Sequence, residues 1–181
     1  MFDRTTKLIL ILAVLAAVLG GIIQRENRSP PPANRNSTIV GQLVPALALP
    51  DLRGRVHPLT EYRGRRVLIN FWASWCGPCL EEMPALSQAQ QKFGETDAIV
   101  LGIAMDEPDR VRKFIAAHPV GYPILLGRLE APSTSLQLGD EYEILPFSVL
   151  IGADGHILAM QVGKLSAAQI DTWLAPAHQQ P

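Results

Sequence analysis

The chain has 181 residues, which is enough for one well-packed domain. The formal net charge is -1 and charged residues make up 18%, with no basic stripe of the kind that binds nucleic acid. Two cysteines are too few for a disulfide-stapled scaffold or for a four-thiolate zinc site.

The first clear pattern is an apolar run from Leu8 to Ile23, with Lys7 before it and Arg25 after it. As a helix this run is roughly 24 Å long, close to the ~30 Å hydrocarbon core of a bilayer, and the flanking cations can snorkel to the interfaces. No small-x-small cleavage site follows, so an uncleaved anchor is favoured over a cleaved signal peptide. We therefore expect residues 1–23 to form a single transmembrane anchor that exports the domain after it.

The remaining chain divides by composition. Residues 24–37 are rich in Pro, Asn, Arg and Ser and cannot bury a core, so they are expected to form a flexible linker. Residues 38–176 carry the hydrophobic patterns of one folded domain, and residues 177–181 are a short tail. No internal repeat is present.

The elements expected of the domain alternate between strands and helices. They are, in chain order, a hairpin turning at 51–54, a buried strand at 67–72, a helix at 77–93, a buried strand at 98–104, a helix at 108–117, strands at 122–126, 147–151 and 156–162, and a helix at 166–174. Asp154 and Gly155 form the turn of the second hairpin, and Ser166 is the N-cap of the last helix. This order predicts an α/β fold with a central mixed sheet flanked by helices, preceded by an N-terminal β-hairpin.

The two cysteines stand where the central strand gives way to a helix. Cys76 and Cys79 are three apart in a first helical turn, so their Cα atoms fall within the range that a disulfide permits. The N-terminal end of a helix favours a thiolate, which makes Cys76 the expected attacking sulfur. Cys79 lies one turn deeper and would resolve the mixed disulfide. Gly77 leaves the approach to sulfur open, and Pro78 is tolerated because first-turn N–H groups lack intrahelical partners.

Other interpretations of the pair are two incidental buried cysteines or half of a metal site. A Cys-x-x-Cys that follows an apolar strand and opens a helix favours redox chemistry over metal binding. The four histidines, at 57, 118, 156 and 178, show no metal-ligand spacing, and we expect them at the surface. No metal and no cofactor beyond the cysteine pair itself is predicted.

Residues 71–79, Phe-Trp-Ala-Ser-Trp-Cys-Gly-Pro-Cys, resemble the active-site segment of the thioredoxin superfamily. The wider stretch 45–86 and the later segments 144–147 and 154–155 are similar to the TlpA/ResA branch of membrane-anchored thiol reductases. The resemblance covers most of residues 40–174 and implies a thioredoxin-like fold.

The resemblance also assigns roles to residues outside the cysteine pair. It places Glu82 as the acid–base group beside Cys79, while cytoplasmic thioredoxins carry a buried Asp where this chain has Asn70. It implies a cis bond before Pro146, with the Leu145 backbone pairing with extended substrate. Trp75 is expected to shield the sulfur and to contact substrate.

The implied activity is that of an extracytoplasmic thiol-disulfide oxidoreductase, held at the inner (cytoplasmic) membrane with its domain on the periplasmic side. Its expected direction is reduction of disulfides in exported proteins, such as apocytochrome c or copper-centre assembly clients. A membrane electron donor of the DsbD/CcdA type would recharge it. The alternatives left open are a net oxidase, a thiol peroxidase and a non-enzymatic copper(I) carrier using Cys76, Cys79 and Met83.

Overall fold

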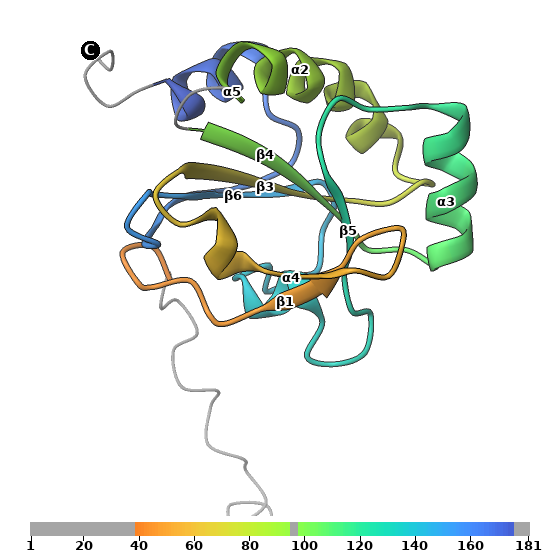
Figure 1. Cartoon of the computed structure of the whole chain (residues 1–181), viewed down its shortest axis with the longest axis horizontal. Helices are drawn as coiled ribbons and strands as arrows, with labels where there is room; N and C mark the ends of the chain where they lie inside the picture. The colour runs from red at the N-terminus through yellow and green to blue at the C-terminus, as the bar shows by residue number, and fades with distance from the viewer. Residues whose placement is uncertain (1–38, 95–97, 176–181) are drawn as a thin grey trace, which may run out of the picture. The chain divides into compact units, whose positions relative to one another are not determined.

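A computed structural model of the protein describes residues 39–94 and 98–175 (Figure 1). The expected anchor (1–23), linker (24–37) and tail (177–181) lie outside the described residues, as do both ends of the expected domain. Within the described ranges, no helix is long and apolar enough to cross a membrane.

A five-stranded mixed sheet forms the centre of the domain, in the order β5-β4-β3-β6-β7. Strands β3 (Arg66–Trp72), β4 (Ala98–Ala104) and β5 (Ile124–Leu126) are parallel. Strands β6 (Phe147–Ile151) and β7 (Ile157–Val162) continue the sheet in antiparallel pairing. All of β3 after Arg66 is buried, as its continuous apolar run predicts for a strand covered on both faces.

Helices cover both faces of this sheet, as expected. Helices α2 (Gly77–Phe93) and α5 (Ala167–Leu174) pack against each other on one face, and Val111 and Phe114 of α3 (Pro108–Ala117) join the same apolar cluster. The 3₁₀ helix η1 (Leu59–Tyr62) and the short α4 (Thr134–Gln137) lie on the other face, where α4 is drawn opposite α2 and α5 (Figure 1).

The hairpin of β1 (Ala48–Pro50) and β2 (Val56–Pro58) is present as expected, and Gly54 in its turn has a φ of 85° that favours glycine. Residues 39–58, which we call the N-terminal wrap, reach the outer strand at each edge of the sheet. Asp51 forms a bridge with Leu125 of β5, and Leu43 forms one with His156 at the start of β7. Leu47 and Leu49 of the wrap are buried in the apolar cluster beneath the sheet.

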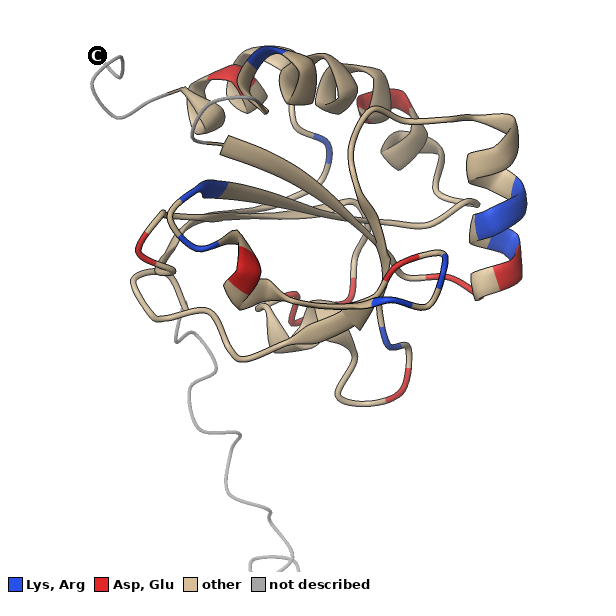
Figure 2. Cartoon of the chain, viewed as in Figure 1, with Lys and Arg blue, Asp and Glu red and all other residues tan. Residues whose placement is uncertain are grey.

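Lys, Arg, Asp and Glu are nearly excluded from the strands. Arg66, at the first position of β3, is the exception among the seven described strands, and the other charges lie on helices, turns and loops (Figure 2). The strands therefore contribute mainly apolar contacts to the core, and the few polar groups buried among them need an explanation.

Most predicted bounds agree with the structure to within one residue. Strand β5 is an exception, because it begins at Ile124 rather than Tyr122; Pro123 has no N–H to donate to the ladder. Helices η1 and α4 are not among the predicted elements, since four residues show no periodicity.

Candidate active site

Cys76 and Cys79 form a disulfide at the start of α2, with their Cα atoms 5.3 Å apart. Cys76 is the N-cap residue of the helix and has extended backbone angles, while Cys79 lies within the first turn. Cys79 is fully buried and Cys76 is 5% exposed. The depth order predicted from the sequence is therefore present in the fold.

The first turn of α2 provides a favourable place for a negative charge. No side chain caps the helix, and its first turn contains no acidic residue. When the disulfide is reduced, a thiolate on Cys76 would lie at the positive end of the α2 dipole. That field stabilises a thiolate relative to a thiol at this position.

Asp106 fixes the segment that leads into Cys76, and it was not among the predicted site residues. It follows β4 and is 5% exposed, and its carboxylate accepts hydrogen bonds from both the N–H and the hydroxyl of Ser74. The signal for it was available, because parallel strands β3 and β4 end at the same edge of the sheet. Residues after both strands should therefore meet there.

Glu82 lies one turn after Cys79 and is 2% exposed. One carboxylate oxygen, Oε1, accepts a hydrogen bond from Asn70 Nδ2 at 2.6 Å, and the other, Oε2, accepts from the N–H of Leu165 at 2.8 Å. Burial raises the pKa of Glu82, and the two hydrogen bonds oppose that rise in part. The structure thus provides a desolvated carboxyl group on the helix that carries the cysteines.

Its neighbour Glu81 is exposed and forms an ion pair with Lys164, with Oε2 and Nζ 2.7 Å apart. Lys164 holds the pKa of Glu81 below its usual range. The two adjacent carboxyl groups therefore occupy opposite environments, and Glu82 is the buried one, as expected.

The peptide bond between Leu145 and Pro146 is cis, as the family resemblance predicts. Because Phe147 pairs with Phe71 of β3, Pro146 comes next to the end of β3 that leads to the cysteines. Within the described residues, the carbonyl of Pro146 accepts from Gly163, whereas no hydrogen bond is formed by the backbone of Leu145. The Leu145 backbone is thus available to an extended peptide.

Asp140, another residue that the sequence did not single out, holds the loop before Pro146. It is 1% exposed, and its Oδ1 accepts a hydrogen bond from the N–H of Ile144 at 3.0 Å. The same loop contains Glu143 with a φ of 51°, a left-handed conformation that is rare for a residue with a side chain. Burial raises the pKa of Asp140.

The predicted contact residues around the cysteines differ in exposure. Trp75 is 67% exposed beside Cys76, and Gly77 and Pro78 are also exposed. A Cβ atom placed on Gly77 would meet no heavy atom within 4 Å, so packing does not require glycine there. Trp72 is fully buried and packs against Phe114, which agrees with a structural role.

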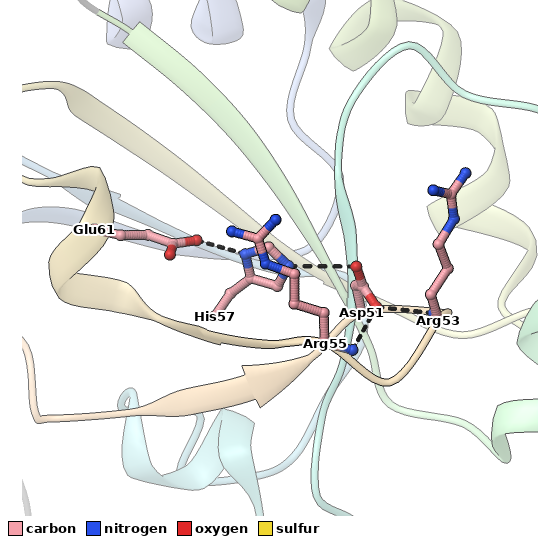
Figure 3. A network of polar contacts seen from close by, with 5 residues as sticks. All are labelled: Asp51, Arg53, Arg55, His57 and Glu61. Carbon is pink, nitrogen blue, oxygen red and sulfur yellow. Dashed lines mark hydrogen bonds and ion pairs between the residues drawn. The ribbon is translucent and has the colours of Figure 1, made fainter.

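One histidine makes contacts that the sequence did not predict. His57 is partly exposed, and its ring lies between two carboxylates of the N-terminal region (Figure 3). Nδ1 lies 2.5 Å from Glu61 Oε1, and Nε2 lies 3.3 Å from Asp51 Oδ2. These partners raise the pKa of His57, with Glu61 contributing most. In the described ranges, no group of three or more His, Cys, Asp or Glu side chains is arranged to hold a metal ion.

Comparison with known proteins gives consistent results. The AhpC/TSA family model matches residues 40–160. The chain is 30% identical over 168 residues to the thiol-disulfide oxidoreductase ResA of Geobacillus thermodenitrificans, covering 92% of this chain and 90% of that protein. It is 29% identical to ResA of Geobacillus kaustophilus, covering 91% and 90% of the two chains.

Solved structures share the fold. A thiol:disulfide interchange protein of the thioredoxin family from Chlorobium tepidum aligns with a TM-score of 0.63 at 23% identity, covering 73% of this chain and 92% of that one. StoA from Bacillus subtilis aligns with a TM-score of 0.57 at 22% identity, covering 72% and 97%. The chain belongs to the AhpC/TSA family and is a ResA/TlpA-like thiol-disulfide oxidoreductase with a thioredoxin-like fold.

Proposed function

We propose that this oxidoreductase reduces disulfides in exported proteins, with Cys76 as the attacking sulfur and Cys79 as the resolving sulfur. The observation that carries the proposal is the placement of Cys76 at the uncapped start of α2, with Cys79 fully buried one turn below. A thiolate is stabilised at the first position, and the second is reached only after a mixed disulfide has formed.

The reaction proceeds in two exchanges. The Cys76 thiolate attacks one sulfur of the substrate disulfide, forms a mixed disulfide and releases the other substrate sulfur as a thiolate. Cys79 then attacks the sulfur of Cys76, which releases the second substrate thiolate and closes the Cys76–Cys79 disulfide. Two electrons have passed to the substrate, and a dithiol donor must return two electrons before the next cycle.

Glu82 would act in the second exchange. Cys79 must lose its proton to become a nucleophile, and a carboxylate with a raised pKa is a suitable acceptor inside the domain. When the donor reduces the disulfide, Glu82 returns the proton to Cys79. Glu82 is therefore proposed as the acid–base group of the cycle.

The substrate would lie across the cysteines in an extended conformation. Leu145 supplies free backbone groups beside the cis Pro146, and exposed Trp75, Gly77 and Pro78 border Cys76. Backbone pairing of this kind tolerates many side chains, which suits an enzyme that acts on more than one client. Apocytochrome c and copper-centre assembly proteins are the client classes proposed.

The location and the donor are proposed from the apolar run Leu8 to Ile23 and from the family resemblance. An inner-membrane anchor would keep the domain on the periplasmic side, beside a membrane electron donor of the DsbD/CcdA type. Alkaline carbonate extraction of membranes and protease digestion of spheroplasts test this placement. Release of the intact chain by carbonate, or its protection from protease, contradicts it.

Substrate trapping tests the order of attack. The Cys79→Ser variant should accumulate mixed disulfides with exported proteins through Cys76, because the hydroxyl cannot resolve them. The Cys76→Ser variant is the matched control and should trap none. Trapping by Cys76→Ser in place of Cys79→Ser would reverse the assignment.

A redox titration of the pair tests the direction of the reaction. A reductase should have a potential near that of thioredoxin, about -270 mV, whereas a strong oxidant lies near about -120 mV. Peroxide consumption measured on the same preparation addresses a thiol peroxidase. Turnover of peroxide that disappears in Cys76→Ser would favour that activity over disulfide reduction.

A further inference from the structure

A chain of buried polar groups joins helix α2 to two neighbouring strands of the sheet. Glu82 of α2, Asn70 of β3 and Ser148 of β6 are 0–2% exposed, and Asn70 and Ser148 are direct partners in the β3–β6 register. Asn70 Nδ2 donates to Glu82 Oε1 at 2.6 Å and to Ser148 Oγ at 3.1 Å. The other end of the same amide, Asn70 Oδ1, is buried with no hydrogen-bond partner among the described residues.

This arrangement suits an ionised Glu82 and does not suit a protonated one. Both carboxylate oxygens accept hydrogen bonds from donors, namely Asn70 Nδ2 and the N–H of Leu165. A carboxylic acid has an O–H that itself needs an acceptor, and neither partner offers one. Yet burial favours the protonated form, so the site has to accommodate it.

A half-turn of the Asn70 amide gives this O–H an acceptor, and it leaves Nδ2 in the position where Oδ1 now has no partner. The turn brings Oδ1, which now lacks a partner, to the position from which Nδ2 donates. Oδ1 can then accept from the Glu82 O–H. The Ser148 hydroxyl, which now accepts from Nδ2, can rotate and donate to Oδ1, because a hydroxyl serves as donor or acceptor.

We propose that Asn70 and Ser148 are positioning residues that follow the proton on Glu82: the amide turns and the hydroxyl reverses each time Glu82 gains or loses that proton. This proposal rests on the proposed role of Glu82 as proton acceptor from Cys79. In each cycle the proton passes from the Cys79 thiol to Glu82 and back, and only hydrogen-bond directions change at Asn70 and Ser148. Glu82 therefore has a hydrogen-bond partner in both protonation states.

None of the other ionisable groups near Glu82 is placed to accept the hydrogen bond of its protonated form, which Asn70 can do. Lys164, in the loop before α5, attracts the carboxylate form but is already paired with Glu81. Tyr122, which precedes β5, feels the charge of Glu82, but its hydroxyl has no hydrogen-bond partner in the described chain. Cys79 supplies the proton itself and lies on the same helix.

NMR of the full chain in detergent micelles, labelled at Asn, Ser and Glu, tests the turn directly. Above the titration midpoint of the Glu82 carboxyl carbon, the Asn70 side-chain amide protons should show cross-relaxation to the Ser148 β protons. Below that midpoint the cross-peak should weaken several-fold, because oxygen replaces nitrogen at that place. A cross-peak of constant intensity through the titration of Glu82 overturns the proposal.

The Glu82→Gln variant provides a fixed copy of the protonated state. Its amide oxygen must accept from the N–H of Leu165, so its NH₂ faces Asn70 and requires Oδ1 there. The Asn70–Ser148 cross-peak should therefore be weak at every pH. Glu81→Gln, on the exposed side of α2, is the matched control and should keep the pH-dependent Asn70–Ser148 cross-peak. A strong Asn70–Ser148 cross-peak in Glu82→Gln contradicts the turn of the Asn70 amide.

The Asn70→Leu variant connects the turn to the reaction. The variant removes a charge-assisted hydrogen bond from the carboxylate and a weaker neutral one from the carboxylic acid, so the Glu82 titration midpoint should rise by about one pH unit. The pH at which resolution by Cys79 becomes fast should rise by the same amount. A Glu82 titration midpoint that does not move in Asn70→Leu overturns the proposal. If Asn70→Leu does not fold, the spectra of the natural chain and of Glu82→Gln test the turn instead.

The two proposals can fail separately. If Glu82→Gln leaves the pH–rate profile of resolution unchanged, Glu82 is not the proton acceptor, whatever the Asn70 amide does. If the profile changes while the cross-peak stays constant, Glu82 keeps its role and the turn of Asn70 is excluded.

Discussion

A carboxyl group placed out of reach of water lowers the stability of the fold whenever it is ionised. Glu82 is such a group, since its pKa in the folded chain lies above that of an unfolded one. Its favourable contribution is complete below the unfolded pKa and is lost as the pH rises through the folded pKa. The residue proposed for proton transfer is thus a source of instability at neutral and alkaline pH.

This sign leads to a prediction for stability. Glu82→Gln should raise the melting temperature relative to the natural chain at pH 8, and the difference should shrink at pH 4, where Glu82 carries a proton in both states. Calorimetry at the two pH values measures it. Glu81→Gln, on the exposed side of α2, serves as the control, and equal effects of the two variants would argue that burial of Glu82 is not the cause.

Asp106 is a second buried carboxylate that affects the stability of the fold, here through its hydrogen bonds. Its carboxylate accepts two hydrogen bonds from Ser74 and one from the N–H of Glu107, so Asp106→Ala leaves three donors without their partner. The expected loss is about 1–3 kcal/mol of unfolding free energy, measured by urea denaturation. Asp109→Ala removes an exposed carboxylate from α3 and should change stability far less.

At the level of elements, the start of α5 connects helix capping to the site. Ser166 and Gln169 form a capping box, and the residue before this box, Leu165, donates its N–H to Glu82. The cap therefore fixes the backbone that also positions the buried carboxylate.

Ser166→Ala should reduce the unfolding free energy by about 1 kcal/mol, because the N–H of Gln169 loses its acceptor. Ser166→Asp restores an acceptor and should recover most of the loss. Urea denaturation of the three proteins measures this. Equal stability of the Ala and Asp variants would mean that the cap does not stabilise α5.

The contacts of His57 connect the N-terminal hairpin to η1 and depend on pH. Its pKa is raised, so its contribution is complete below the unfolded pKa and fades as the pH rises through the folded one. The pKa values of Asp51 and Glu61 are lowered, so their contributions fade as the pH falls through their folded pKa values. The network is strongest in mildly acidic solution, between these limits.

His57→Gln should therefore reduce stability most near pH 5, by less than about 1 kcal/mol because the groups are partly solvated, and least near pH 9. Urea denaturation across this pH range measures the difference. His156→Gln, in an exposed pair with Asp154, is the control. A deficit that is constant with pH would mean that the charge of His57 is not involved.

The sequence predicts those elements whose signals are local. The period of α2, the apolar runs of β3 and β4 and the Gly54 turn all lie within a few consecutive residues, and these predictions are confirmed. The position of Cys76 and Cys79 at the start of α2 was predicted from an equally local pattern. Helix α4 is too short to show a period, and it was missed.

Contacts between distant segments could not be predicted in this way. Asn70 meets Ser148 across 78 residues, and Ser74 meets Asp106 across 32 residues, so no local pattern indicates either pair. The contacts of His57 were not predicted for a related reason, because the fold of the hairpin brings Asp51 and Glu61 to its ring. The sequence located the cysteine pair, Glu82 and the cis Pro146, but not the long-range contacts that surround them.

For the domain as a whole, the N-terminal wrap reaches the core and both outer strands of the sheet. It contributes Leu47 and Leu49 to the core beneath the sheet and forms bridges on the β5 side and the β7 side. Its contribution is therefore to the stability of the domain as a unit, although it supplies no residue to the cysteine site.

Deletion of residues 39–58 from the full chain should produce a protein that aggregates, because it exposes the apolar face under β3 and frees backbone groups at both outer strands. Light scattering and size-exclusion chromatography measure this. Val56→Ser changes an exposed apolar residue within the wrap, 58% exposed, and should leave the protein monodisperse. A monodisperse deletion variant would show that the wrap is dispensable.

The bridges of the wrap also affect whether two copies of the protein can associate through their outer strands. Outer strands are where one sheet can add a strand from a second molecule. Here the backbone of Gly41, Gln42 and Val44 already exchanges hydrogen bonds with the segment 155–157, and Asp51 occupies a place beside Leu125. A neighbouring copy would have to displace this segment before its own strand could pair with Ile157 or Leu125. The first residues of the domain thus occupy part of each outer strand, away from the end of the inner strand β6 at which a client peptide would be received.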